Sequence, residues 1–148
     1  MFLLSAVLAV MLSAATAAAA TETPAVVVAA ADSPVKIGRA TVVTVAGDPP
    51  VLLYEATNQT DQDFEQFTVM VFVFNAKGFL KTEQIAPGRR TLEARSTKYS
   101  TIVLDGGPVD PSDSFIVGVN QAQPVNSENW WRADLKAAVE SARPPRTP

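Results

Sequence analysis

The sequence predicts an all-β sandwich, and three observations lead to this prediction. Short runs rich in β-branched and aromatic residues recur from Val35 onward, and turn-forming residues separate them. No long helical stretch lies between successive runs, which argues against a parallel α/β sheet. About seven such runs fall within about 90 residues, as the strands of a sandwich do. We therefore place a β-sandwich domain at residues 35–123.

The predicted strands are bounded by turn signals. The separators carry Gly, Pro, Asn or Asp, which supply a positive φ or hold φ near about −65°. We expect antiparallel sheets. The predicted strands cover residues 36–46, 51–57, 66–75, 79–85, 90–94, 98–104 and 114–121.

The run at residues 67–74 is apolar on both of its faces. Its second face carries Met70, Phe72 and Phe74. A strand with one solvated face alternates apolar and polar residues, so both faces of this strand must be covered. A helix from the C-terminal part of the chain is the favoured cover. The alternative is that Met70, Phe72 and Phe74 form an exposed patch for a partner protein.

The beginning of the chain has the composition of a secretory signal. Residues 2–12 are apolar and uncharged, and a stretch of small residues follows them. We expect a signal peptide at residues 1–20 that is cleaved after Ala20, with a second candidate site after Ala31. The apolar core of about 11 residues is shorter than the roughly 20 needed to span a bilayer, so we expect no membrane span after cleavage.

Three further segments flank the predicted domain. Residues 21–34 are rich in Ala, Val and Pro and are expected to be a linker, unless residues 26–28 add an edge strand. Residues 124–142 are expected to contain an amphipathic helix that begins near Ser127. The tail, residues 143–148, is rich in Pro and Arg and is expected to be disordered. The apolar residues at helical spacing are Trp131, Leu135, Ala138, Val139 and Ala142.

The composition excludes several kinds of site. The chain has no His and no Cys, so it cannot form a Cys or His zinc site, a thiol nucleophile, a Ser-His-Asp triad or a disulfide. Lys plus Arg number 12 against 15 Asp plus Glu, and this balance leaves no basic surplus for nucleic acid. We therefore expect no cofactor, no nucleic-acid partner and no enzymatic activity.

An acidic loop is the one candidate metal site in the sequence. Asp61, Asp63 and Glu65 stand at alternate positions between two predicted strands. Calcium takes six to eight oxygen ligands, and such a loop supplies several of them. The order of residues in an EF-hand is absent, because the Gly and the later bidentate Glu are missing. A solvated polar turn is therefore the favoured interpretation, with calcium binding as the alternative.

Trp130 is a further candidate for binding a partner. Adjacent residues on a helix point about 100° apart, so Trp130 and Trp131 cannot both face the core. Trp131 belongs to the apolar stripe, which leaves Trp130 as the freer ring. Trp is a common anchor at protein interfaces.

Several motifs resemble those of a known family. They are residues 52–58, the run 69–74 with the turn at 75–78, and the later Ala86, Pro87 and Gly88. Together these segments resemble the FxLYD-type immunoglobulin-like domains of secreted bacterial proteins, over about residues 51–120. The motif that names the family falls on residues that keep its apolar and turn character: Val71, Val73, Phe74 and Asn75. The resemblance implies an extracytoplasmic, immunoglobulin-like antiparallel sandwich that acts as a binding or structural module.

The combined expectation is an exported, non-enzymatic interaction or structural module of the cell envelope, periplasmic or secreted. Its expected partner is another envelope protein, with Trp130, Met70, Phe72 and Phe74 as candidate contact residues. The alternative is a domain that binds calcium or a small ligand through carboxylates, or an enzyme that works without His or Cys.

Overall fold

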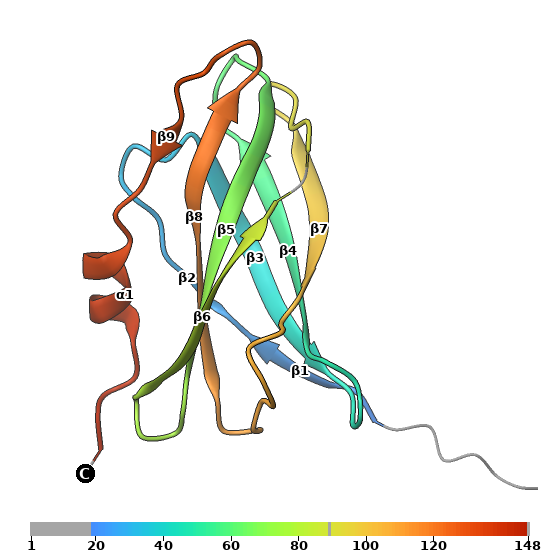
Figure 1. Cartoon of the computed structure of the whole chain (residues 1–148), viewed down its shortest axis with the longest axis vertical. Helices are drawn as coiled ribbons and strands as arrows, with labels where there is room; N and C mark the ends of the chain where they lie inside the picture. Colours follow the sequence, from blue (N-terminus) through green and yellow to red (C-terminus); the bar gives the residue numbers. More distant parts are fainter. Residues whose placement is uncertain (1–18, 89, 148) are drawn as a thin grey trace, which may run out of the picture.

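The structure, a computed structural model, describes residues 19–88 and 90–147. Residues 1–18 of the predicted signal peptide lie outside this part. Figure 1 shows two β-sheets packed face to face with a short helix beside them, which confirms the predicted all-β sandwich with a C-terminal helix.

The first sheet has the strand order β1-β3-β4-β7, and all of its neighbouring strands are antiparallel. Its members are β1 (Thr21–Pro24), β3 (Val35–Thr44), β4 (Val51–Asn58) and β7 (Thr97–Val103).

The second sheet has the order β2-β8-β5-β6. Strand β2 is parallel to the first half of β8, and β9 is antiparallel to its second half. The members are β2 (Val26–Val27), β5 (Phe64–Phe74), β6 (Leu80–Pro87), β8 (Ser114–Pro124) and β9 (Trp131–Arg132).

The main core lies between the two sheets and is built from alternate residues. On β4, for example, Leu52, Tyr54 and Ala56 point inward and are buried, whereas Leu53 points outward. This period of two is what the pleat of a strand imposes. The facing residues of β5 include Phe67, Val69, Val71 and Val73.

A second apolar cluster covers the other face of β5. Helix α1 (Lys136–Ala142) lies over this face, and its buried residue Val139 joins Leu135 against Phe72 and Phe74. Phe72 and Phe74 are 8% and 4% exposed, so the predicted cover by the C-terminal part is confirmed and the alternative of an exposed patch is wrong. Met70 is half-buried beside them.

A glycine on β8 lets this cover approach closely. A Cβ atom on Gly118 would lie 2.8 Å from the carbonyl oxygen of Val28 and 3.0 Å from Cδ1 of Leu135. Real Cβ atoms do not approach backbone oxygens so closely. The missing side chain at Gly118 therefore allows the segment after β2 and the start of α1 to pack directly on the sheet.

The segment predicted as a linker, residues 21–34, contains strands instead. Strand β1 pairs with β3, and Val26 and Val27 pair with Ile116 and Val117 of β8. The predicted linker was therefore wrong, and the edge strand considered for residues 26–28 is present as β2. The edges of β3 and β8 supply the unpaired backbone groups that these short segments need.

The strand predicted at residues 90–94 does not form. Leu92 makes an isolated bridge with Phe64, and Thr91 and Arg95 adopt positive φ angles of 56° and 57°. Such angles interrupt an extended strand. The segment crosses the end of the sandwich rather than joining a sheet.

The predicted C-terminal helix is shorter than expected. Trp131 lies in β9, where it pairs with Ala122, and its indole Nε1 donates a hydrogen bond to Asp32 (3.1 Å). Backbone pairing with the open edge of β8 therefore takes precedence over the helical spacing of the side chains. The tail was expected to be disordered, but the part that the structure describes contacts the domain: the Thr147 amide donates a hydrogen bond to the Lys77 carbonyl (3.2 Å).

Replacing Leu135 with Ala tests the cover over β5. Leu135 is buried against Phe72 and Phe74, so the Leu135→Ala variant should lose about 2–4 kcal/mol of unfolding free energy. Lys136→Ala, on the exposed neighbour, should change it by less than about 0.5 kcal/mol. Chemical denaturation of residues 21–148 measures both. Equal stability of the two variants would contradict the packing described here.

Candidate functional site

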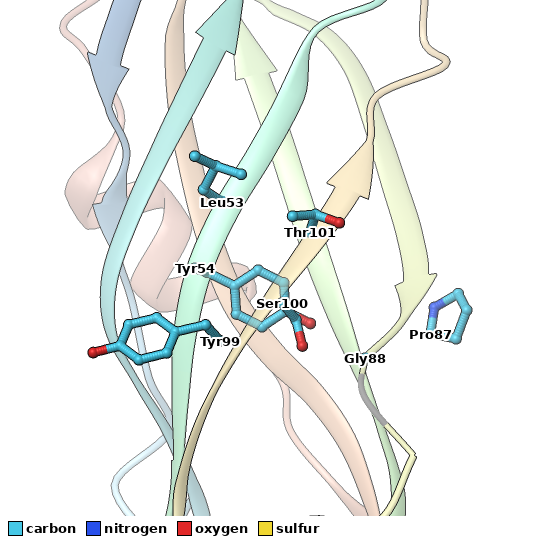
Figure 2. Close-up of a pocket in the computed structure, with 7 residues that line it drawn as sticks. All are labelled: Leu53, Tyr54, Pro87, Gly88, Tyr99, Ser100 and Thr101. Atoms are coloured by element: carbon cyan, nitrogen blue, oxygen red, sulfur yellow. The ribbon is translucent and has the colours of Figure 1, made fainter.

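A hollow opens on the flank of the sandwich, where β7 and β6 are the outer strands of the two sheets. Its volume is about 560 Å³. Figure 2 shows its lining, with β4 and β7 on one side and the end of β6 on the other. The lining residues are Leu53, Tyr54, Pro87, Gly88, Tyr99, Ser100 and Thr101.

Tyr54 forms the inner wall of this hollow. It is 3% exposed, and its hydroxyl makes no hydrogen bond with any described residue that meets normal geometry. Burial raises the pKa of the Tyr54 hydroxyl, and the neighbouring Ser100 hydroxyl opposes part of this rise. Buried polar groups nearly always have a partner, so this hydroxyl is suited to bind a group that enters the hollow.

Gly88 forms the opposite wall and has no room for a side chain. A Cβ atom there would lie 2.4 Å from Cε2 of the buried Phe67 ring. The Gly88 amide also donates to the Phe67 carbonyl. The missing side chain at Gly88 therefore lets this turn pack directly against the Phe67 ring.

Exposed apolar residues lie on the outer face of the first sheet, next to the hollow. Tyr99 is 72% exposed, Val103 54% and Leu53 42%. The register places Leu53 opposite Thr101, and Glu55 opposite Tyr99. These positions alternate with the inward residues of β4 and β7, so they form one continuous surface, which we call the outer face of β4 and β7.

A second, shallower hollow of about 210 Å³ adjoins this face. It shares Leu53, Tyr54 and Tyr99 with the first hollow. Its rim is charged and includes both signs: Glu22, Arg39 and Glu55. An apolar centre with a polar rim is the arrangement found in many protein interfaces.

The buried side chain of Asn58 fixes the chain segment around Leu92 near the flank. Its Nδ2 donates to the carbonyl oxygens of Gln62 (2.7 Å), Glu93 (3.1 Å) and Leu92 (3.2 Å). Its Oδ1 accepts hydrogen bonds from the amide and hydroxyl of Thr60, both at 2.9 Å. Asn58 thus holds the segment around Leu92 at the end of the sandwich, and Lys98 of β7 binds the Thr91 carbonyl of the same segment (3.1 Å).

The three carboxylates considered for calcium are not brought together by the fold. Asp61 accepts hydrogen bonds from Arg95 (2.8 and 3.1 Å), and Asp63 accepts one from the Ala94 amide (2.7 Å). The Arg95 guanidinium lowers the pKa of Asp61. Glu65 is exposed on β5. In the described part of the chain, no three Asp or Glu residues lie together in a way that could hold a metal ion.

The other candidates lie apart from the hollow. Met70, Phe72 and Phe74 belong to the cluster beneath α1, and Trp130 is half-buried in the segment before β9. The sequence analysis missed Leu53 and Tyr99. A signal was present, because both are apolar residues at positions where a strand with one wet face would carry polar ones.

Comparison with known proteins adds no relative: no family model matches the chain, and neither the curated proteins nor the solved structures contain a match. Within residues 19–88 and 90–147, no helix has the length and apolar character needed to cross a membrane.

The Asn58→Ala variant tests the hydrogen bonds that close the end of the sandwich. It leaves the Leu92 and Glu93 carbonyls without this donor in a buried place, so we expect a loss of about 2–4 kcal/mol in unfolding free energy. Urea denaturation of residues 21–148 measures it. Gln59→Ala, at the exposed neighbour, is the matched control and should change stability by less than about 0.5 kcal/mol.

Calcium should leave the thermal stability of the chain unchanged. Asp61 and Asp63 already bind Arg95 and the Ala94 amide, and a cation would have to displace these contacts. Any ligand that binds the native state raises Tm, so a thermal melt with millimolar calcium measures binding. A rise in Tm that the Asp61→Asn, Asp63→Asn double variant abolishes would show that this expectation is wrong.

Proposed function

We propose that the chain is an exported, non-enzymatic interaction module that binds a partner protein of the cell envelope through the outer face of β4 and β7. The observation that carries this proposal is the exposure of Tyr99, at 72%, beside Leu53 and Val103. Tyr is enriched at protein interfaces because its large ring also carries a polar group. The adjoining hollow adds a recess that can seat part of the partner.

The chemistry of the lining supports a binding role. The side chains around the flank hollow carry hydroxyl groups and apolar surface, and among the residues that the structure describes none of those lining it is charged. Burial raises the pKa of the Tyr54 hydroxyl above its usual value, so this group stays protonated at neutral pH and is available as a hydrogen-bond donor. Shape and hydroxyl groups therefore define what this site recognises.

Export is supported by the apolar and small-residue pattern at the beginning of the chain. Cleavage after Ala20 would retain β1 and β2, whereas cleavage after Ala31 would remove both strands. We therefore place the processing site after Ala20. The described fold then lies wholly within the exported chain.

The strand order supports the proposed relationship to FxLYD-type immunoglobulin-like domains. In an immunoglobulin sandwich the sheets contain strands A, B and E on one side and C and F on the other. Strands β3, β4 and β7 take the first set of places, and β5 and β8 take the second. Such domains commonly serve as binding modules.

Charge reversal of the apolar face tests the proposal. Residues 21–148 serve as bait for envelope proteins, and the captured partner is then purified and titrated. The Leu53→Lys, Tyr99→Lys double variant should weaken binding by about tenfold or more, because it places two charges at the centre of the interface. Ile85→Lys, at an exposed apolar residue of the other sheet, is the matched control.

Trp130→Ala belongs in the same titration, since Trp130 is the other candidate anchor. If the double variant leaves partner binding unchanged and Trp130→Ala abolishes it, the interface includes Trp130 and does not lie on the outer face of β4 and β7.

A further inference from the structure

We propose that a groove between α1 and β6 binds a single-chain amphiphile with an anionic head group, such as a fatty acid. Figure 1 shows α1 beside the second sheet, with the C-terminal end of the chain below the helix. The groove is therefore on the outer side of the second sheet, whereas the outer face of β4 and β7 belongs to the first. This inference goes beyond the proposed function and does not depend on it.

Helix α1 covers only part of the outer side of the second sheet. A groove of about 530 Å³ remains between the helix, the tail and β6. Pockets that bind small molecules usually have volumes of about 300–1,000 Å³ and mostly apolar linings. The volume of this groove therefore suits a ligand of that size.

The floor and walls of the groove are apolar. Phe72, Phe74 and Val139 are buried and form the floor. Leu80 forms the wall on the side of β6 and is 50% exposed, and Ala137 lies on the side of α1. These five side chains carry no polar group, so a ligand that enters between them gains by burying apolar surface.

The rim of the groove is mostly cationic. Lys136, Arg143 and Arg146 line it together with one carboxylate, Glu140, and Arg143 pairs with that carboxylate (2.7 Å). The Lys136 ammonium and the Arg146 guanidinium form no ion pair with a described residue. Two cations are therefore available to an anion at this rim, although the whole chain has a net charge of −3.

The tail is held in a position that completes the rim. Gly78 has a φ of 75°, and a Cβ atom on it would lie 2.7 Å from the carbonyl oxygen of Pro144. The Thr147 amide donates to the Lys77 carbonyl (3.2 Å). The backbone of the tail thus packs directly on the turn between β5 and β6, and this contact places Arg146 beside the groove.

The lining favours an alkyl chain over a peptide. The floor and walls come from a helix and the face of a sheet, in which backbone amides and carbonyls pair with one another. Among the described lining residues, only the four charged side chains of the rim have polar groups. A peptide on this floor would bury backbone groups without partners, which is unfavourable. An alkyl chain has no such groups, and its anionic head would meet Lys136 and Arg146.

Calorimetric titration of residues 21–148 with dodecanoate, below its micelle concentration, tests the proposal. We expect saturable binding of one dodecanoate per chain. Dodecyltrimethylammonium has an alkyl chain of the same length with a cationic head and should bind about tenfold or more weakly, because the rim repels it. Nonspecific adsorption to this acidic chain would give the opposite preference.

Methyl NMR signals locate the bound chain. The signals of Leu80 and Val139 should shift when dodecanoate binds, because both side chains line the groove. The signal of Val103, an exposed residue of the first sheet, should stay unchanged.

A matched pair of charge reversals tests the rim. Lys136→Glu should weaken dodecanoate binding by about fivefold or more, because repulsion replaces attraction at the head group. Lys36→Glu makes the same change at an exposed position of β3 in the other sheet and should bind within about twofold of the wild type.

A second matched pair tests the apolar wall. Leu80→Asp should weaken dodecanoate binding by about tenfold or more, because it replaces apolar surface with a charge of the same sign as the head group. Ile85→Asp, on the same strand but outside the groove, should bind within about twofold of the wild type. Both positions are at least half exposed, at 50% and 59%, so neither variant disturbs the core.

The proposal is wrong if dodecanoate does not bind saturably, if the cationic amphiphile binds as tightly, or if Lys136→Glu and Leu80→Asp behave like their controls. Binding to anionic phospholipid vesicles without binding to monomeric dodecanoate would also overturn it, in favour of a membrane-surface site. The charge-reversal experiment on Leu53 and Tyr99 uses a different ligand and a different sheet, so the failure of either proposal leaves the other standing.

Discussion

The burial of β5 on both of its faces is the constraint on which the rest of the structure depends. One face packs against the first sheet and forms the main core, and the other carries Phe72 and Phe74, which need a second cover. Helix α1 has only 7 residues, and an isolated helix of that length is not stable in water. It is therefore held by the apolar surface that it covers. The chain has no Cys and therefore no disulfide, so this packing supplies the stability that disulfides give to many small secreted domains.

A second, local interaction at the end of β4 fixes the chain segment between β6 and β7. The Asn58 side chain donates hydrogen bonds to the Leu92 and Glu93 carbonyls and so binds the segment between β6 and β7 to the end of the sandwich. The same segment contacts β7 through Lys98, which donates to the Thr91 carbonyl (3.1 Å). The hollow lined by Tyr54 and Gly88 lies on this flank of the sandwich.

The sequence predicted the long strands well because their period-two patterns and turn signals are local. It failed where tertiary contacts compete with local preference. Trp131 fits a helical stripe, yet its backbone completes the edge of β8 and its indole binds Asp32. Residues 90–94 have the composition of a strand, but the hydrogen bonds from Asn58 and the bridge with Phe64 hold Leu92 elsewhere. The candidate site was the part that the sequence predicted least well. Leu53 and Tyr99 come from two strands far apart in the sequence, and only the register between β4 and β7 brings them together.

By itself, the sequence determined the all-β class, the main strands and the need to cover both faces of β5, because the apolar pattern along a strand, on one face or on both, is a property of that strand alone. It also excluded His, Cys and disulfide chemistry by composition. The tertiary structure decided which strands are neighbours and which segment covers β5. These outcomes depend on competition among distant segments for the same backbone groups and apolar surface. The sequence of one segment does not show which of the competing segments forms the contact.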